Sequence, residues 1–203
     1  LAGFEDIGHM EVLQRLSNAS AVYTMLSTKG LRVVHLTTHR SIARVADAVT
    51  KDNILKMITV TNDQFRLWGF SNPKIGVSAL NPHASDSGLL GDEESLAISP
   101  AVEDAKKNGI LASGPIPADV IFHDAIQGKY DVVLAMYHDQ GHIPIKVYGF
   151  EESISINLGL PFVRTSVDHG TAFDIAGKGI ANHLSMINAL KEASMLVKGQ
   201  GIL

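Results

Sequence analysis

Apolar runs and apolar residues at helical spacing alternate along this chain of 203 residues. Short apolar runs, which are typical of buried or half-buried strands, lie at residues 21–27, 31–37, 74–80, 132–136, 153–158 and 162–167. Helical spacing or capping residues predict helices at residues 10–17, 41–48, 52–65, 93–107, 118–126 and 182–197. Strands that alternate with helices indicate an α/β fold with a largely parallel sheet, in which the first two strands form a hairpin.

Three of the predicted strands each lead into a polar loop that contains a histidine. These histidines are His39, His83 and His138. Ligands of open α/β sheets gather beyond the carboxyl ends of the strands, so we expect the three imidazoles to converge there. Three neutral imidazoles can bind a divalent cation and leave positions open for a substrate oxygen. A histidine after a strand is more often an ordinary hydrogen-bonded loop residue, so only the repetition favours a metal site.

The segment 134–146 places two imidazoles, a carboxylate, an amide and an ammonium directly after a predicted buried strand. We expect a turn there rather than a continuous helix, because Gly141 and Pro144 both disfavour a helix. The spacing of His138 and His142 is that of the H-E-x-x-H zinc peptidases, which bind zinc on a helix. A broken helix makes a peptidase the weaker interpretation, and His142 is then expected to support a neighbouring ligand.

Two cations and a glycine-rich segment are candidates for binding an anionic ligand. Lys146 offers a point charge and Arg164 a bidentate fork, although solvated surface cations are the more common alternative. Arg164 lies within an apolar run, so we expect it to have an anionic partner. Residues 169–179 lack the G-x-G-x-x-G pattern, but their small side chains would let the backbone approach a flat or phosphorylated ligand. An ordinary flexible loop is the alternative.

Composition narrows the classes of function. The absence of cysteine excludes disulfides, thiolate nucleophiles and sulfur-ligated metals. A net charge of −4, with acids and bases interspersed, argues against a nucleic-acid partner. No apolar run approaches the ~18 residues of a membrane helix and no signal-like leader opens the chain, so we expect a cytoplasmic protein without membrane contact. The chain begins within an expected loop, residues 3–8, so an N-terminal part is expected to be missing.

Four stretches of the sequence resemble one enzyme family. Residues 137–141 read Tyr-His-Asp-Gln-Gly, and a longer motif runs from residue 158 to residue 172. The triplet at 37–39 and the stretch Asn-Pro-His-Ala at 81–84 match earlier motifs of the same family. Together they resemble the 4-hydroxythreonine-4-phosphate dehydrogenase family of vitamin B6 biosynthesis, from about Gly8 to the C-terminus.

The resemblance implies the fold of isocitrate and isopropylmalate dehydrogenases, with two α/β/α lobes and the site in the cleft between them. On this basis residues 1–150 form a central metal-binding and dimerisation lobe, and residues 151–203 form the C-terminal part of an NAD-binding lobe. The family's N-terminal segment is not in this chain. The resemblance also implies a homodimer in which His39, His83 and His138 bind a divalent metal (Zn, Mg, Mn or Co), with ligands drawn from both subunits.

The resemblance further implies substrate, cofactor and catalytic positions. The expected substrate-binding residues are Thr38, Lys146, Ser155 and Arg164. The expected NAD-binding residues are His169, Gly170, Thr171, Ala172, Asp174, Ile175 and Asn182. In the wider superfamily an Asp-Ile pair in this loop accompanies NAD rather than NADP, because a carboxylate accepts from a ribose 2'-hydroxyl and repels a 2'-phosphate. Asp139, Asp168 and Lys146 are the candidates for moving protons or orienting a histidine.

The implied reaction is an NAD- and metal-dependent oxidation of the 3-hydroxyl of a phosphorylated four-carbon acid, followed by decarboxylation. 4-Hydroxythreonine 4-phosphate, in pyridoxal phosphate biosynthesis, is the first candidate substrate. Ser155 stands where the biosynthetic enzymes commonly have an asparagine, and residues 142–144 resemble paralogues that oxidise 4-phospho-D-threonate or 4-phospho-D-erythronate. These paralogues are the alternative. A metallohydrolase that needs no nicotinamide and an inactive dimerisation fragment are more distant alternatives.

Overall fold

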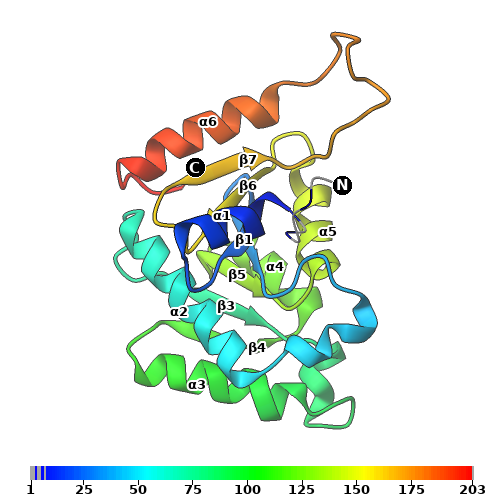
Figure 1. The fold of residues 1–203 in the computed structure, drawn as a ribbon. Helices are drawn as coiled ribbons and strands as arrows, with labels where there is room; N and C mark the ends of the chain where they lie inside the picture. The colour runs from blue at the N-terminus through cyan, green and yellow to red at the C-terminus, as the bar shows by residue number, and fades with distance from the viewer. Residues whose placement is uncertain (1–2, 4–5, 7, 203) are drawn as a thin grey trace.

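The computed structural model describes residues 3, 6 and 8–202, and it contains one seven-stranded sheet with helices on both faces (Figure 1). The predicted α/β fold class is therefore confirmed. The strands are β1 (Tyr23–Thr28), β2 (Leu31–His35), β3 (Ile75–Ser78), β4 (Ala112–Ile116), β5 (Val132–Ala135), β6 (Ile154–Leu158) and β7 (Arg164–Val167). The α-helices are α1 (His9–Ser17), α2 (Lys51–Leu67), α3 (Ser99–Lys107), α4 (Ala118–Ile126), α5 (His138–Gly149) and α6 (Leu184–Val197). The loop expected at residues 3–8 includes residues 4, 5 and 7, which lie outside the described residues.

The strand order β4-β3-β5-β2-β1-β6-β7 divides the sheet into two halves. Neighbouring strands from β4 to β2 are parallel, whereas β2 to β7 are antiparallel. The expectation of a largely parallel sheet is therefore wrong, because three of the six neighbouring pairs are antiparallel. The cause is the length of the connections. β1 and β2 are joined through Lys29 and Gly30, the predicted hairpin, and such a short link cannot hold a crossover helix.

Two apolar layers hold the sheet between its helices. Helices α2, α3 and α6 cover one face, and α4 and α5 cover the other. Successive strand residues point to opposite faces. In β2, for example, Val34 packs into the first layer and Val33 into the second. None of the helices in the described ranges is long and apolar enough to cross a membrane.

The sheet is continuous across the boundary predicted between residues 1–150 and 151–203. Strand β1 pairs with β6 from Tyr23 and Leu158 to Ser27 and Ile154. The assignment of the two parts to separate lobes stays a prediction.

Three elements differ from the predictions. The helix expected at residues 41–48 is two short 3-10 turns, η1 (Ile42–Arg44) and η2 (Ala46–Ala48). The helix expected at residues 93–107 begins with a π-helical turn, η4 (Glu94–Ile98), before α3. Strand β4 was not predicted, because Gly114 and Pro115 lower its β-propensity. β4 lies at the edge of the sheet, where a proline is tolerated.

The expectation of a turn after β5 is wrong, because this segment is the helix α5. Pro144 lies inside the helix and leaves one carbonyl without its usual N–H donor. Gly141 is the reason the helix can form here. A Cβ atom at Gly141 would lie 2.3 Å from Nε2 of His35 and 2.7 Å from Cγ1 of Val33. The glycine that disfavours an isolated helix therefore lets α5 lie directly against β2.

Candidate functional site

The segments that follow β2, β5 and β3 all lie beyond the carboxyl ends of these strands, at one end of the sheet. These strands are adjacent and parallel, so their carboxyl ends coincide. The first two loops are also tied together: the backbone N–H of Leu36 donates to the carbonyl of Ala135 at 2.8 Å, and the Thr37 hydroxyl donates to the carbonyl of Met136 at 2.9 Å. The three predicted ligand histidines therefore follow the carboxyl ends of neighbouring strands, His39 and His83 in loops or turns and His138 as the first residue of α5.

His39 and His138 are close to each other at this edge. Their ring centroids are 6.1 Å apart, and both rings line a cavity of about 430 Å³ together with Thr38, Tyr137 and Asp139. A cation bound to an imidazole lies roughly 3 Å from the ring centroid, since metal–nitrogen bonds are about 2.0–2.1 Å long. Two rings that share a cation are therefore separated by roughly 5–6 Å, and this pair fits a shared metal.

His83 is not part of that pair. It lies in the turn η3 (Pro82–Asp86) and is exposed. Among residues 3, 6 and 8–202, no three histidine, aspartate or glutamate side chains are close enough together to hold a metal ion. The structure of one chain thus brings together two of the three predicted ligands.

Asp139 orients the ring of His138. Its Oδ1 atom lies 2.7 Å from Nδ1 of His138, which places a proton on Nδ1. The Nε2 lone pair is then the one available to a ligand or metal, and the carboxylate fixes the orientation of the ring.

A second histidine, His142, stacks on His138 with ring centroids 3.5 Å apart. Its Nδ1 atom lies 2.9 Å from the carbonyl of His138 and 3.1 Å from Nε2 of His35. His35 in turn has Nδ1 3.2 Å from the carbonyl of Thr24. A carbonyl only accepts, so Nδ1 of His35 carries a proton and its Nε2 accepts from Nδ1–H of His142. The ring against His138 is therefore fixed in position and tautomer.

Burial controls the charge of these two supporting histidines. Burial, with a further contribution from His142, lowers the pKa of His35 to about 3. Burial also lowers the pKa of His142, and the neighbouring His138 adds to this effect. Both rings are therefore neutral near pH 7, which leaves His138 stacked on an uncharged neighbour.

Lys146 lies two turns further along α5, beside Asp168 at the end of β7. Its ammonium donates to the backbone carbonyl of Asp168 and lies 3.4 Å from the hydroxyl of Ser153. The Asp168 carboxylate oxygen Oδ2 is 2.8 Å from the ammonium, but the geometry is not that of a hydrogen bond. This buried oxygen has no hydrogen-bond partner among the described residues. Its partner is the Lys146 ammonium, in an ion pair.

The predicted substrate residues Ser155 and Arg164 share one face of β6 and β7. Arg164 is paired in register with Asn157, and its Nη1 donates to the Asn157 amide oxygen at 3.2 Å. Within the described residues its hydrogen-bond partner is this amide, and the anionic partner expected for Arg164, a group of the substrate, stays a prediction. Burial lowers the pKa of Arg164 from its ordinary value, but an arginine side chain stays charged in a protein. The guanidinium keeps most of its N–H groups for a ligand.

The loop between β7 and α6 lines a second cavity with Lys146. This loop, orange in Figure 1, extends away from the sheet. The cavity has a volume of about 450 Å³, and five of the predicted NAD-binding residues line it: His169, Thr171, Ala172, Ile175 and Asn182. The two others, Gly170 and Asp174, lie on the same loop and are exposed.

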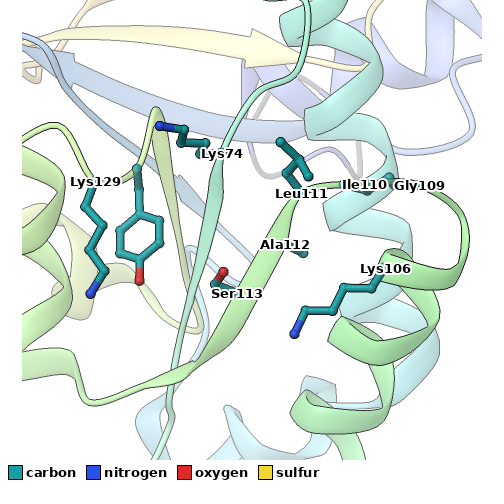
Figure 2. Close-up of a pocket in the computed structure, with 9 residues that line it drawn as sticks. Lys74, Lys106, Gly109, Ile110, Leu111, Ala112, Ser113 and Lys129 are labelled. Carbon is teal, nitrogen blue, oxygen red and sulfur yellow. The ribbon is translucent and has the colours of Figure 1, made fainter.

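A third cavity, of about 490 Å³, lies at the opposite end of the strands, around the residues that precede β3 and β5. Figure 2 shows the lysines around it, Lys74, Lys106 and Lys129. Lys74 immediately precedes β3, and Lys129 lies three residues before β5, whereas the histidine-bearing segments follow these strands. Ligands of α/β sheets bind at the carboxyl ends of strands, so this cavity is not the candidate site.

Sequence reasoning assigned no role to Gln140 or His35. Gln140 is buried; its amide donates to the carbonyl of Ala79 at 2.7 Å, and its oxygen accepts from the N–H of Met136 at 2.7 Å. It thus ties the end of β3 to the end of β5. Its position between two histidines was a usable signal. His35 closes an apolar run and gave none.

Known proteins share this chain's sequence and fold. Residues 1–193 match the family model described as "Pyridoxal phosphate biosynthetic protein PdxA". Two curated relatives, from Oceanobacillus iheyensis and Fusobacterium nucleatum, are 48% and 50% identical over 92% and 93% of this chain. Their names assign both provisionally as D-threonate 4-phosphate dehydrogenases, and the chain spans 56% of the length of each.

A solved structure shows the same arrangement of elements. The crystal structure of 4-hydroxythreonine-4-phosphate dehydrogenase from Klebsiella pneumoniae matches with a TM-score of 0.88 at 42% identity. The match covers 96% of this chain and 60% of that one. The family model and the relatives agree with the resemblance seen in the motifs, and the chain belongs to the PdxA family.

Proposed function

We propose that this chain is part of an NAD- and divalent-metal-dependent dehydrogenase that oxidises the 3-hydroxyl of a phosphorylated four-carbon acid, with subsequent decarboxylation. The observation that carries the proposal is the arrangement along α5. His138 opens the helix beside His39, and Lys146, eight residues later, lines the cavity of the expected NAD loop. At about 1.5 Å per residue the two positions are about 12 Å apart, a span suited to a four-carbon phosphate beside a nicotinamide.

The residues of the chain would divide the work as follows. His39 and His138 would hold the metal, which would supply Lewis-acid polarisation of a substrate hydroxyl, and NAD would supply the hydride acceptor. Lys146 would orient an anionic group of the substrate, and Arg164 would bind another. Asp168, whose Oδ2 atom lies 2.8 Å from the Lys146 ammonium, would accept the proton of the reacting hydroxyl. Asp139 holds the tautomer of His138.

We further propose a homodimer in which the third ligand, His83, comes from the second subunit. Exposed apolar side chains on the outer face of α5 support the proposal that a second subunit covers this face. Ile143, Val147 and Phe150 recur at helical spacing beside the site and are 59%, 82% and 70% exposed. A second copy on this face would bury them and bring another histidine-bearing turn to the edge. A cytoplasmic location remains our prediction for this enzyme.

4-Hydroxythreonine 4-phosphate is the first candidate substrate, since the matched family model concerns pyridoxal phosphate biosynthesis and the Klebsiella enzyme carries that name. D-Threonate 4-phosphate is the second candidate. It is favoured by the names of the two relatives, which are closer in sequence than the Klebsiella enzyme. The substrates differ in the group at C2, an amine or a hydroxyl, and Ser155 on β6 is a candidate contact to it.

The test is NADH formation by absorbance in the intact protein, with NAD, a divalent metal and each substrate in turn, 4-phospho-D-erythronate included. We expect turnover of at least one. His138→Ala should abolish turnover without unfolding the protein, whereas His123→Ala, an exposed histidine on α4, should not change it. Undiminished activity of His138→Ala would remove the metal assignment. Metal binding without NADH formation from any of the three substrates would refute the reaction and leave a metallohydrolase as the better interpretation.

A further inference from the structure

Glu94 is a buried carboxylate that contacts the loop preceding His83. It opens the π-helical turn η4 and is 3% exposed. Its Oε1 atom accepts from the backbone N–H of Leu80 at 2.9 Å and from that of Asn81 at 2.8 Å. Its Oε2 atom accepts from the amide of Asn81 at 2.9 Å. Three donors of one short loop thus converge on a single side chain.

The turn after these donors has an uncommon backbone. Residues 83–87, which we name the left-handed turn, all have positive φ angles, between 46° and 66°, and none is a glycine. L-residues visit this region singly and at a cost, so five in succession need external support. The structure supplies it at the N-terminal end, through Glu94. Gly91 completes the arrangement, because a Cβ atom there would lie 2.6 Å from the Asn81 amide nitrogen.

Gln140 connects the same loop to the helix that carries His138. It donates to the carbonyl of Ala79, directly before the two residues that Glu94 holds. Its other contact, with the N–H of Met136, fixes the start of the His138 segment. The path from Glu94 through Leu80 and Ala79 to Gln140 therefore sets the position of the left-handed turn relative to α5.

We propose that Glu94 is a positioning residue, which holds the left-handed turn so that His83 is presented as a metal ligand. This inference rests on the proposed function, in which His83 binds a divalent cation. Glu94 itself makes no contact with the metal. It acts through the backbone of Leu80 and Asn81, and its removal leaves these N–H groups without their acceptor in a partly buried place.

The first measurement is hydrogen exchange of residues 80–90 in the intact, metal-free protein. Glu94→Met keeps the length of the side chain but accepts no hydrogen bonds. Exchange in this segment should become faster, while exchange in α5 and α6 stays as in the wild type. Glu103→Met, at an exposed position of α3, is the matched control and should leave residues 80–90 unchanged. Unchanged exchange in Glu94→Met would overturn the proposal without any reference to metal.

The second measurement is Co²⁺ affinity, followed by the visible spectrum of the bound ion. Glu94→Met should weaken binding by about tenfold or more, the usual effect of removing a residue that orients a ligand. Glu94→Gln keeps an oxygen for the backbone donors and should restore most of the affinity. If Glu94→Met does not fold, Glu94→Asp replaces it, because its carboxylate is one methylene further from the backbone donors, and the same loss of affinity is expected. Affinity within about twofold of wild type in the folded Met or Asp variant would refute the positioning role.

His83→Ala separates this inference from the proposed function. If His83→Ala binds Co²⁺ as tightly as the wild type, His83 is not a ligand and the metal assignment fails. If His83→Ala weakens binding and the folded Glu94 variants do not, the metal assignment stands and the positioning role fails.

Discussion

The parallel half of the sheet (β4, β3, β5, β2) and the antiparallel half (β1, β6, β7) carry different parts of the candidate site. Every residue of β3 and β5 is buried, whereas every residue of β7 is only half-buried. The histidine-bearing loops of the parallel half are tied by Gln140 and by backbone hydrogen bonds. Residues 169–184, beyond the antiparallel half, are almost all exposed.

This difference indicates two modes of ligand binding. Side chains on short loops of a buried parallel sheet are held in place before a ligand arrives, which suits a metal with fixed geometry. An exposed loop with many glycines has few contacts to lose and can close around a larger ligand. We therefore expect the metal side to be rigid and the NAD side to become ordered on binding. Four comparisons test this contrast.

The largest effect is expected from adding a methyl group to a glycine in each half. Gly141→Ala would place Cβ 2.3 Å from His35 and should lower the free energy of unfolding by about 3 kcal/mol, the upper range for overpacking. A Cβ atom at Gly170 would have no atom of the described residues within 4 Å, so Gly170→Ala should leave the free energy of unfolding unchanged. Chemical denaturation of both variants measures the difference. Equal stabilities would show that α5 is not tightly packed on β2.

Acid should destabilise the parallel half through His35. Its pKa is about 3 in the folded protein and near 6.5 when unfolded, so the unfolded chain binds the proton first. The free energy of unfolding should fall below pH 6.5, by up to about 1.4 kcal/mol per pH unit for this one group. His35→Asn should reduce that slope, and His123→Asn should not. Denaturation between pH 7 and 4 provides the measurement, and an unchanged slope in His35→Asn contradicts the assignment.

Each half of the molecule contains an alanine whose backbone φ angle is positive. Ala84 has φ 53° in the left-handed turn, and Ala172 has φ 48° in the exposed loop between β7 and α6. Ala84→Gly should raise the free energy of unfolding by about 1 kcal/mol, because glycine adopts this conformation without a steric cost. Ala172→Gly should have less effect, since a loop that opens locally contributes little to global unfolding. Thermal melting of the two variants measures this, and a larger gain at Ala172 would reverse our view of the loop.

The smallest effect on stability is expected at Asp174, which is exposed on the loop proposed to bind NAD. Asp174→Ala should leave the melting temperature unchanged. It should reduce the preference for NAD over NADP by about tenfold, because the repulsion of a 2'-phosphate is removed. Steady-state kinetics with both cofactors test this prediction. Retention of the full preference would place the specificity elsewhere on the loop.

The local pattern of apolar and polar residues was sufficient to predict most of the helices and strands. Strong apolar periodicity predicted α2, α6 and the strands of the core, and the position of three histidines after strands predicted the edge at which they lie. The errors occurred where a contact distant in sequence decides the local structure. Gly141 and Pro144 disfavour an isolated helix, but packing on His35 and Val33 makes a helix of α5. No pattern in residues 134–146 alone contains that contact.

The candidate site was predictable in its residues but not in its geometry. The motifs gave His39, His138 and Lys146, and the structure brings the first two together and places the third on the same helix as His138. Whether a side chain is held depends on partners far along the chain. Glu94 supports the His83 loop from a helix that was predicted without any role, and Arg164 is held by the amide of Asn157 on the neighbouring strand.

Pro115 has a consequence for how copies of this protein can associate. β4 and β7 are the two edges of the sheet, and exposed edges invite pairing with strands of another chain. β4 is five residues long and contains Pro115, which has no N–H to offer, and lysines surround its start (Figure 2). Strand-to-strand aggregation at this edge is therefore disfavoured. Association through α5 does not use this edge. Pro115, which lowered the β-propensity of β4 and so prevented its prediction, also protects the edge that β4 forms.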